Sequence, residues 1–205
     1  MTGHDEDRDM VFLTGTYQLW SPPAAAACEL DLGCGSGSFT AQLAKKYPER
    51  RILAADVMVG RLRKLVKRIR REKLDNLTVL RTEARHLVGL ALPDRCLDRI
   101  HLLCPDPWPK GRHRGHRLLA SDFTAQLHRV LKPDGIFHFS SDDANYCRAV
   151  EEVMTQSKLF APAPDGAADL ADVKSDFERR WREEGRTVRH LFFARLPLPP
   201  KTIGH

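Results

Sequence analysis

A glycine-rich segment between an apolar run and a helical pattern is the first feature of the sequence that could do chemistry. Glu29-Leu-Asp-Leu-Gly-Cys-Gly-Ser-Gly37 follows a predicted strand and precedes a predicted helix, which is the setting in which a loop holds a nucleotide-like ligand. Glycine lets the backbone turn tightly and approach the ligand closely. The spacing is G-x-G-x-G, whereas dinucleotide sites have G-x-G-x-x-G, so a dinucleotide oxidoreductase is the least favoured enzyme class.

An acidic residue stands where a ligand of that kind would carry its sugar. Asp56 ends the next predicted strand, about 20 residues beyond the loop, where a carboxylate holds ribose hydroxyls in related sites. A carboxylate there can accept hydrogen bonds from the 2′ and 3′ hydroxyls. The two features together indicate a ribose-containing cofactor, and a glycine-rich turn without a ligand is the alternative.

The most specific feature of the chain is a proline-rich loop, Leu103-Cys-Pro-Asp-Pro-Trp-Pro-Lys110. Alternating prolines fix φ and suppress helix, which makes the loop stiff and extended. It follows a predicted strand, and ligands bind at the carboxyl ends of strands in open α/β sheets. The loop therefore presents Asp106 and Lys110 on a preorganised backbone. Trp108 offers either a flat surface for stacking or, more commonly for tryptophan, a packing side chain.

Strands and helices that would position these loops alternate along the chain. The predicted strands are 28–32, 51–56, 77–81, 97–104 and 135–141, the predicted helices are 39–46, 61–73, 118–131 and 145–157, and 177–182 with 188–195 is predicted as a closing antiparallel pair. This alternation predicts βαβ units and a mostly parallel sheet. Residues 161–172 are rich in Ala, Pro, Asp and Gly, which predicts a mobile surface loop.

The charge pattern favours a polyanionic partner. The 205 residues include 33 Lys and Arg against 27 Asp and Glu, a formal net charge of +6. The basic residues gather in three clusters: eight in 61–73, four in 110–117, and Arg179, Arg180, Arg182, Arg186 and Arg189. Such clusters bind phosphates without reading sequence. The first cluster is equally well a solvated helix face, whereas the second adjoins the proline loop.

Composition also limits the class of protein. No apolar run approaches the roughly 20 residues that span a bilayer, and the polar, acidic start is no secretory signal. Five cysteines without a Cys-x-x-Cys pair suggest neither a disulfide framework nor a zinc ribbon. We expect a cytoplasmic protein with no membrane and no metal.

Both loops resemble those of known enzymes. The glycine loop resembles the first motif of class I methyltransferases, which use S-adenosylmethionine, and Pro105-Asp-Pro-Trp-Pro-Lys110 resembles the signature of bacterial tRNA (guanine-N7)-methyltransferases. Further segments resemble that family in the same order: Arg112-His113, Arg117-Leu118, Ser141-Asp142 with Asn145-Tyr146, and Ser175-Asp-Phe-Glu-Arg-Arg180. The resemblance spans 28–195, most of the chain.

The resemblance implies a single S-adenosylmethionine-dependent methyltransferase domain over 1–205, with 1–20 a short N-terminal arm and 196–205 an irregular tail. The implied fold is α/β and Rossmann-like, with a mostly parallel seven-stranded sheet, an antiparallel C-terminal strand and helices on both faces. It implies transfer of a methyl group to N7 of a guanine in tRNA, in the variable loop, by an enzyme that acts without a partner subunit, as a monomer or homodimer.

Individual site residues follow from the same resemblance. The implied cofactor contacts are Asp31, Gly33, Gly35, Asp56, Glu83 and Asp106, with Glu83 near the adenine or merely solvated. Asp106 is the implied catalytic residue, and Lys110, Asp142, Ser175 and Glu178 are the implied substrate contacts. The chain has Asp31, Glu83, Ser175 and Asp176 where the family usually has Glu, Asp, Thr and Lys.

The implied reaction suits a sequence without a Ser-His-Asp arrangement. Guanine N7 has a lone pair and no proton, so no strong base is needed, and orientation supplies most of the acceleration. Asp106 or Asp142 could accept hydrogen bonds from guanine N1 and its 2-amino group and stabilise the positive charge of the methylated ring. The target base must be unstacked to reach such a pocket.

Two other classes of protein remain open at this stage. A class I methyltransferase acting on a small molecule or a protein would keep the glycine loop but leave the proline loop and basic clusters unexplained. A non-catalytic RNA-binding module with a relic cofactor fold would not need Asp31, Gly33, Gly35 and Asp56 to be intact.

Overall fold

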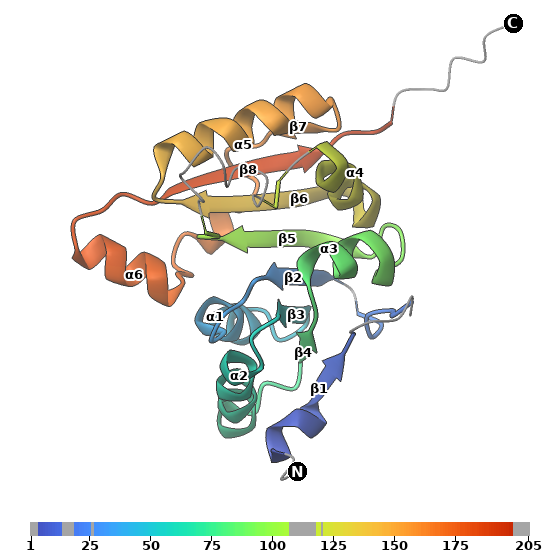
Figure 1. Ribbon diagram of the computed structural model, residues 1–205, viewed down its shortest axis with the longest axis vertical. Coiled ribbons are helices and arrows are strands. Elements are labelled where there is room, and N and C mark those ends of the chain that lie inside the picture. The colour runs from blue at the N-terminus through green and yellow to red at the C-terminus, as the bar shows by residue number, and fades with distance from the viewer. Residues whose placement is uncertain (1–3, 14–18, 26, 107–117, 120, 199–205) are drawn as a thin grey trace, which may run out of the picture.

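The computed structural model describes residues 4–13, 19–25, 27–106, 118–119 and 121–198. An eight-stranded sheet runs through its centre in the order β1-β4-β3-β2-β5-β6-β8-β7 (Figure 1). Its strands are β1 (Met10–Phe12), β2 (Cys28–Leu32), β3 (Arg51–Asp56), β4 (Leu77–Arg81), β5 (Leu97–Leu103), β6 (Leu131–Ser141), β7 (Phe160–Pro162) and β8 (Arg189–Arg195). β1 to β6 pair in parallel, and β8 pairs antiparallel with both β6 and β7.

Helices cover both faces of this sheet. The α-helices are α1 (Ser38–Lys46), α2 (Val59–Glu72), α3 (Ala84–His86), α4 (Ser121–Val130), α5 (Ala144–Ser157) and α6 (Asp176–Glu183), and the shorter turns are η1 (Asp5–Asp9), η2 (Leu87–Ala91) and η4 (Ala168–Leu170). α4, α5 and η2 pack on one face, whereas α1, α2 and η4 pack on the other. The fold class predicted from the sequence is confirmed, with eight strands in place of seven.

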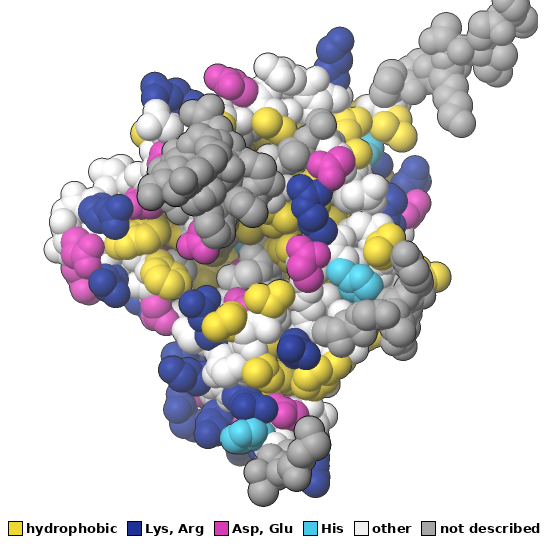
Figure 2. Space-filling model, viewed as in Figure 1, with side chains coloured by type: hydrophobic (Ala, Val, Ile, Leu, Met, Phe, Trp, Pro, Cys, Tyr) yellow, Lys and Arg dark blue, Asp and Glu magenta, His cyan; other side chains and the backbone are white. Residues whose placement is uncertain are grey.

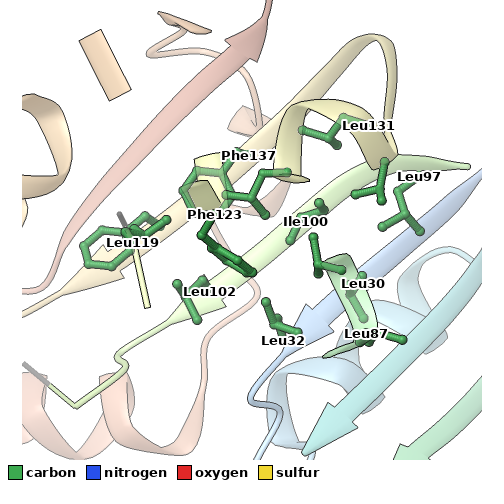
Figure 3. Close-up of a cluster of buried hydrophobic side chains, with 14 of the residues drawn as sticks. Leu30, Leu32, Leu87, Leu97, Ile100, Leu102, Leu119, Phe123, Leu131 and Phe137 are labelled. Atoms are coloured by element: carbon green, nitrogen blue, oxygen red, sulfur yellow. The ribbon is translucent and has the colours of Figure 1, made fainter. Parts of the chain in front are cut away.

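Alternation along the central strands separates an apolar face from a more polar one. Leu30 and Leu32 of β2, Ile100 and Leu102 of β5, and Phe137 of β6 point toward α4 and η2, and all are buried (Figure 3). Each fully buried side chain of this size contributes roughly 1.5–3 kcal/mol to the free energy of folding. The intervening residues of the same strands face the other way and carry the polar groups described below.

One predicted strand is wrong, because 177–182 lies within helix α6. The Oγ of Ser175 accepts a hydrogen bond from the backbone N–H of Glu178 at 3.1 Å, which caps the start of the helix. Arg182 donates to Glu178 one turn earlier at 2.8 Å, and Arg180 pairs with Glu184 at 3.0 Å. Since these local contacts stabilise a helix, β8 pairs with β6 and β7 instead.

The segment 161–172, predicted as a surface loop, is exposed over much of its length but also contains part of a strand and a short helix. Its first residues form β7 on the edge of the sheet, and Ala167 and Leu170 are buried against the α1 and α2 face. The carboxylate of Asp169 accepts two hydrogen bonds from Arg99 of β5, at 2.8 and 3.0 Å, and one from Tyr47. A segment whose composition indicates a loop is thus held in place by one paired aspartate.

The N-terminal arm lies along the basic helix α2. Arg63 donates two hydrogen bonds to Asp7, both at 2.8 Å, and Arg70 pairs with Asp5 and Asp9, each at 2.6 Å. Lys67 lies 3.5 Å from Glu6. In Figure 2 the dark blue side chains of this region gather at the lower left, over α2. Acidic residues of η1 therefore neutralise part of the first basic cluster.

Within the described part of the chain, every helix is too short or too polar to cross a membrane.

Candidate active site

A cleft of about 660 Å³ opens where the parallel strands end. We call it the large cleft. It is lined by the carboxyl ends of β2, β3 and β5, the loops that follow them, and the start of α6. The predicted residues Asp31, Gly33, Gly35, Asp56, Glu83, Asp106 and Ser175 all line it. The topology thus brings together residues that are up to 144 positions apart, as the sequence predicts for this edge of the sheet.

The glycine loop adopts a backbone conformation that other residues rarely take. Gly33, Gly35 and Gly37 have φ values of +80°, +58° and +71°. The N–H groups of Gly33 and Cys34 both donate to the carbonyl of Ala55, at 2.8 and 3.0 Å. Gly37 directly precedes α1, so the loop delivers the chain from β2 into this helix.

Asp56 holds this loop from the neighbouring strand. Its Oδ2 accepts the N–H of Gly35 at 3.0 Å, and its Oδ1 accepts the N–H of Met58 at 2.7 Å. Asp56 is buried at the end of β3. A carboxylate has about four lone-pair directions, so two remain for a ligand.

Asp31 lies beneath the loop in a nearly dry position. It is buried, and its carboxylate accepts a hydrogen bond from the hydroxyl of Thr40 on α1. Burial raises the pKa of Asp31 to about 6, against the opposing effect of the Thr40 hydrogen bond. This carboxyl group therefore changes charge near pH 6, where few other carboxyl groups do.

Glu83 and Thr82 line the cleft after β4. The carboxylate of Glu83 caps α3 by accepting the N–H of His86 at 2.9 Å. Glu83 is exposed and Thr82 is buried. Because Glu83 caps α3, it has a structural role in addition to any contact with a ligand.

A smaller pocket of about 330 Å³ adjoins the large cleft. We call it the adjoining pocket. It shares Cys104, Pro105, Asp106 and Phe177 with the cleft, and its remaining described lining is Asp142, Asp143, Trp181 and Arg186. Asp106 thus stands at the junction of the two cavities.

Aromatic and charged side chains shape this pocket. Phe177 is half exposed, and its ring centroid lies 5.9 Å from that of Trp181 one turn further along α6. Arg186 forms an ion pair with Asp142 and lies over the Trp181 ring, 5.0 Å from its centroid. Phe177, Trp181 and Arg186 line this pocket although they are not predicted as site residues from the sequence.

Glu178 occupies a different place from the other predicted substrate contacts. It is buried, it lines neither of the two cavities above, and its Oε1 accepts hydrogen bonds from Arg182 and His190. Its side chain points into the sheet beneath α6. Lys110 and Trp108 lie outside the described residues.

Cys104 is a thiol at the junction that could be mistaken for a nucleophile. Burial raises its pKa to about 11, so it remains protonated near neutral pH. The five cysteines are free thiols, and the described residues include no cluster of His, Cys, Asp and Glu arranged to hold a metal ion.

Comparison with known proteins places this site in a class. Residues 25–191 match the family described as "Putative methyltransferase". The 16S rRNA methyltransferase KamB superposes with a TM-score of 0.62 at 17% identity, covering 84% of this chain and 89% of that one. A SAM-dependent methyltransferase from Aquifex aeolicus superposes with a TM-score of 0.59 at 15% identity, over 84% of each chain. Fold and site together define a Rossmann-like methyltransferase.

The relatives narrow the class to one family. The tRNA (guanine-N(7)-)-methyltransferase of Syntrophotalea carbinolica is 37% identical over 172 residues, which are 82% of this chain and 74% of that protein. The enzyme of the same name from Nitrosomonas europaea is 33% identical over 168 residues, 81% and 75% of the two chains. The chain belongs to the tRNA (guanine-N(7)-)-methyltransferase family, and the predicted family resemblance is confirmed.

The glycine loop yields a prediction about Gly37. A Cβ atom at this position would lie within 2.8 Å of Cγ of Leu65 on α2, and the φ of +71° is strained for alanine. We expect Gly37→Ala to lower the free energy of unfolding by roughly 1–3 kcal/mol and to weaken cofactor binding. Urea unfolding and calorimetric titration measure the two effects.

Gly60→Ala is the matched control, because a Cβ there meets nothing within 4 Å and the residue lies in helix α2. Alanine should leave the protein as stable or slightly more stable. Equal destabilisation by the two substitutions would contradict the packing argument.

Proposed function

We propose that the protein transfers a methyl group from S-adenosylmethionine to N7 of a guanine in tRNA, at a variable-loop position. The observation that carries this proposal is the pair of adjoining cavities that meet at Asp106, in a chain that belongs to this family. The large cleft is lined by carboxylates, which suit a cationic nucleoside. The adjoining pocket has the size, the carboxylates and the aromatic rings that suit a purine.

The large cleft suits S-adenosylmethionine by charge and by shape. Its described lining includes five carboxylates, Asp31, Asp56, Glu83, Asp106 and Asp176, against the single guanidinium of Arg61. When bound, S-adenosylmethionine supplies an electrophilic methyl group on a positively charged sulfur. Asp31 and the glycine loop would hold the methionine part, the free lone pairs of Asp56 would accept the ribose hydroxyls, and Glu83 would lie by the adenine.

The adjoining pocket suits a guanine whose N7 faces the cleft. The Watson–Crick edge of guanine carries two donors, N1–H and the 2-amino group, and the pocket offers the carboxylates of Asp106 and Asp142 as acceptors. The half-exposed ring of Phe177 gives the unstacked base an aromatic surface, as RNA-binding sites commonly do. The ion pair with Arg186 holds the Asp142 carboxylate in place before the base binds.

The chemistry asks for orientation more than for proton transfer. Because N7 has no proton, the protein has to align N7 with the methyl group and stabilise the positive charge that the purine gains. Asp106 at the junction of the cavities is the carboxylate best placed for that charge, and we assign it as the catalytic residue. Ser175 contributes by capping α6 at the rim of the cleft.

The RNA around the target base would be held by basic side chains near this edge of the sheet. Lys110 and the cluster at 110–117 adjoin the proline loop in the sequence. Arg61 lines the large cleft, and neither it nor Lys64 forms an ion pair with another described residue. We place the enzyme in the cytoplasm, where tRNA is, acting as a monomer or homodimer without a different subunit.

The first test is a labelling experiment. Unmodified tRNA is incubated with the protein and methyl-labelled S-adenosylmethionine, and the label is mapped. We expect one N7-methylated guanine in the variable loop. Cofactor binding without any labelled tRNA would overturn the proposal, and label on another base or on a small molecule would reassign the acceptor.

Asp106 provides a second test. We expect Asp106→Ala to lower the rate of methyl transfer by about 10²–10³-fold, because a carboxylate facing the developing charge is removed, while S-adenosylmethionine still binds. Asp134→Asn is the control, since Asp134 is an exposed carboxylate near the start of β6 and lines neither cavity. Wild-type turnover in Asp106→Ala would refute the assigned role.

The raised pKa of Asp31 gives a third test. As the pH falls through about 6, the carboxyl group of the free protein takes up a proton and loses its attraction for a cation. We therefore expect S-adenosylmethionine to bind about tenfold more weakly at pH 5 than at pH 7. Asp31→Asn should bind weakly with no change over this range, and an identical pH dependence in that variant would contradict the assignment.

A further inference from the structure

A continuous chain of hydrogen bonds crosses the sheet under the active site. His101 Nε2 lies 2.9 Å from Glu29 Oε2, His101 Nδ1 lies 3.0 Å from His138 Nδ1, and His138 Nε2 lies 2.9 Å from His190 Nδ1. The last step joins His190 Nε2 to Glu178 Oε1 at 3.2 Å. We call these five residues the histidine chain. It links β2, just before the glycine loop, to α6, which lines both cavities.

Counting protons shows that neutral rings cannot complete this chain. Four gaps, two between ring nitrogens and two between a ring nitrogen and a carboxylate oxygen, each need one hydrogen, but three neutral imidazoles carry only three. Whichever tautomers the rings adopt, one gap would bring two lone pairs together when both carboxylates are ionised. Although burial works to raise the pKa of Glu29 and of Glu178, their hydrogen bonds from histidines bring both below the usual range. A fourth proton is therefore needed on one of the rings.

Burial decides which ring can carry the fourth proton. His101 is fully buried and faces Glu29, which is already paired with Arg50 and lies 3.9 Å from Arg99. His138 is also buried, and burial holds its pKa well below the usual range. The side chain of His190 is 25% exposed and ends at Glu178, where a cation costs least to desolvate.

We propose that the histidine chain holds one excess proton on His190, and that this imidazolium is a positioning group that fixes α6 for methyl transfer. The positioning role in methyl transfer rests on the proposed function, whereas the location of the excess proton does not. Glu178 is the one residue of α6 that is buried, so its contacts anchor the helix. Phe177 and Trp181 on that helix form the aromatic wall of the adjoining pocket, and Ser175 and Asp176 form part of the large cleft.

Each end of the histidine chain meets a carboxylate that is already paired with an arginine, so solvent exposure is what separates His190 from His101. α6 contributes Arg182, which donates to Glu178 at 2.8 Å, and the segment before it contributes Lys174 to the small cavity beside His190. From β5 comes Arg99, whose charge is matched by Asp169 of η4 at 2.8 Å. α1 and β8 contribute the uncharged rings of Phe39 and Phe192, which pack on His138.

Loss of the excess proton determines how methyl-transfer activity changes with pH. When His190 is protonated, all four gaps are filled and α6 is tied to the sheet. As the pH rises and this proton is lost, two lone pairs face each other in one gap and the anchor of α6 weakens. Activity should therefore fall on the alkaline side, and the fall should belong to His190.

The experiment compares His190→Gln, whose amide can donate to Glu178 without titrating, with His190→Leu, which removes the donor. We expect wild type to lose methyl transfer on the alkaline side, His190→Gln to keep near-neutral activity without that alkaline loss, and His190→Leu to lose about tenfold in kcat at every pH. His128→Gln is the control, because His128 is a buried histidine bonded to the carbonyl of Leu196, outside the chain.

Nitrogen-15 NMR of the imidazole rings is the second readout and needs no tRNA. Among the three rings of the histidine chain, we expect one imidazolium at neutral pH in wild type and in His128→Gln, and none in His190→Gln. Three neutral rings would overturn the excess proton, and an unchanged alkaline loss in His190→Gln would overturn the positioning role. If wild type methylates no tRNA, the proposed function fails, while the spectrum still decides the proton.

Discussion

The ligand end of the sheet depends on the two hydrogen bonds that Asp56 accepts. One comes from Gly35 in the glycine loop and the other from Met58 at the start of α2, so a single buried carboxylate fixes the separation between them. The three glycines of the loop have no side chains to fix its shape, and its positive φ values are held by these contacts and by the carbonyl of Ala55. The width of the large cleft is therefore set at the end of β3.

The polar face of the central strands results from the alternation of side chains along each strand, as does the position of Asp31 in the site. Glu29 and Asp31 of β2, His101 of β5 and His138 of β6 alternate with the leucines and phenylalanines that pack on the opposite face. An unpaired polar group in such a place would cost roughly 1–3 kcal/mol. Because every group in the histidine chain meets a partner, the cost is offset and the network favours one arrangement of β2, β5, β6 and β8.

Much of the fold could be predicted because it depends on local patterns. Strands 28–32, 51–56 and 77–81 lie where the apolar runs predicted them. Helix α6 was missed because its Phe and Trp favour strand, although Ser175-x-x-Glu178 is the pattern of a capping box. The contacts of the segment 161–172 could not be predicted, because its composition says nothing of the pairing between Asp169 and Arg99, 70 residues away.

The site also contains residues that could be predicted from the sequence and residues that could not. Asp31, Gly33, Gly35, Asp56, Glu83 and Asp106 could be placed together because they follow successive strands of one parallel sheet. The histidine chain joins residues 72, 37 and 52 positions apart. Their contacts depend on strand register, such as His101 opposite His138, which no spacing in the sequence encodes.

The structure also changes what the basic clusters mean for RNA. Every arginine of the third cluster is paired with an acid: Arg179 with Asp176, Arg180 with Glu184, Arg182 with Glu178, Arg186 with Asp142 and Arg189 with Glu151. A phosphate must compete with these carboxylates, so each such arginine adds less to RNA affinity than an unpaired one. Since η1 neutralises part of α2 in the same way, net charge overstates the footprint. We therefore propose that discrimination among RNAs comes mainly from the shape of the RNA and from the fit of one unstacked base beside Asp106.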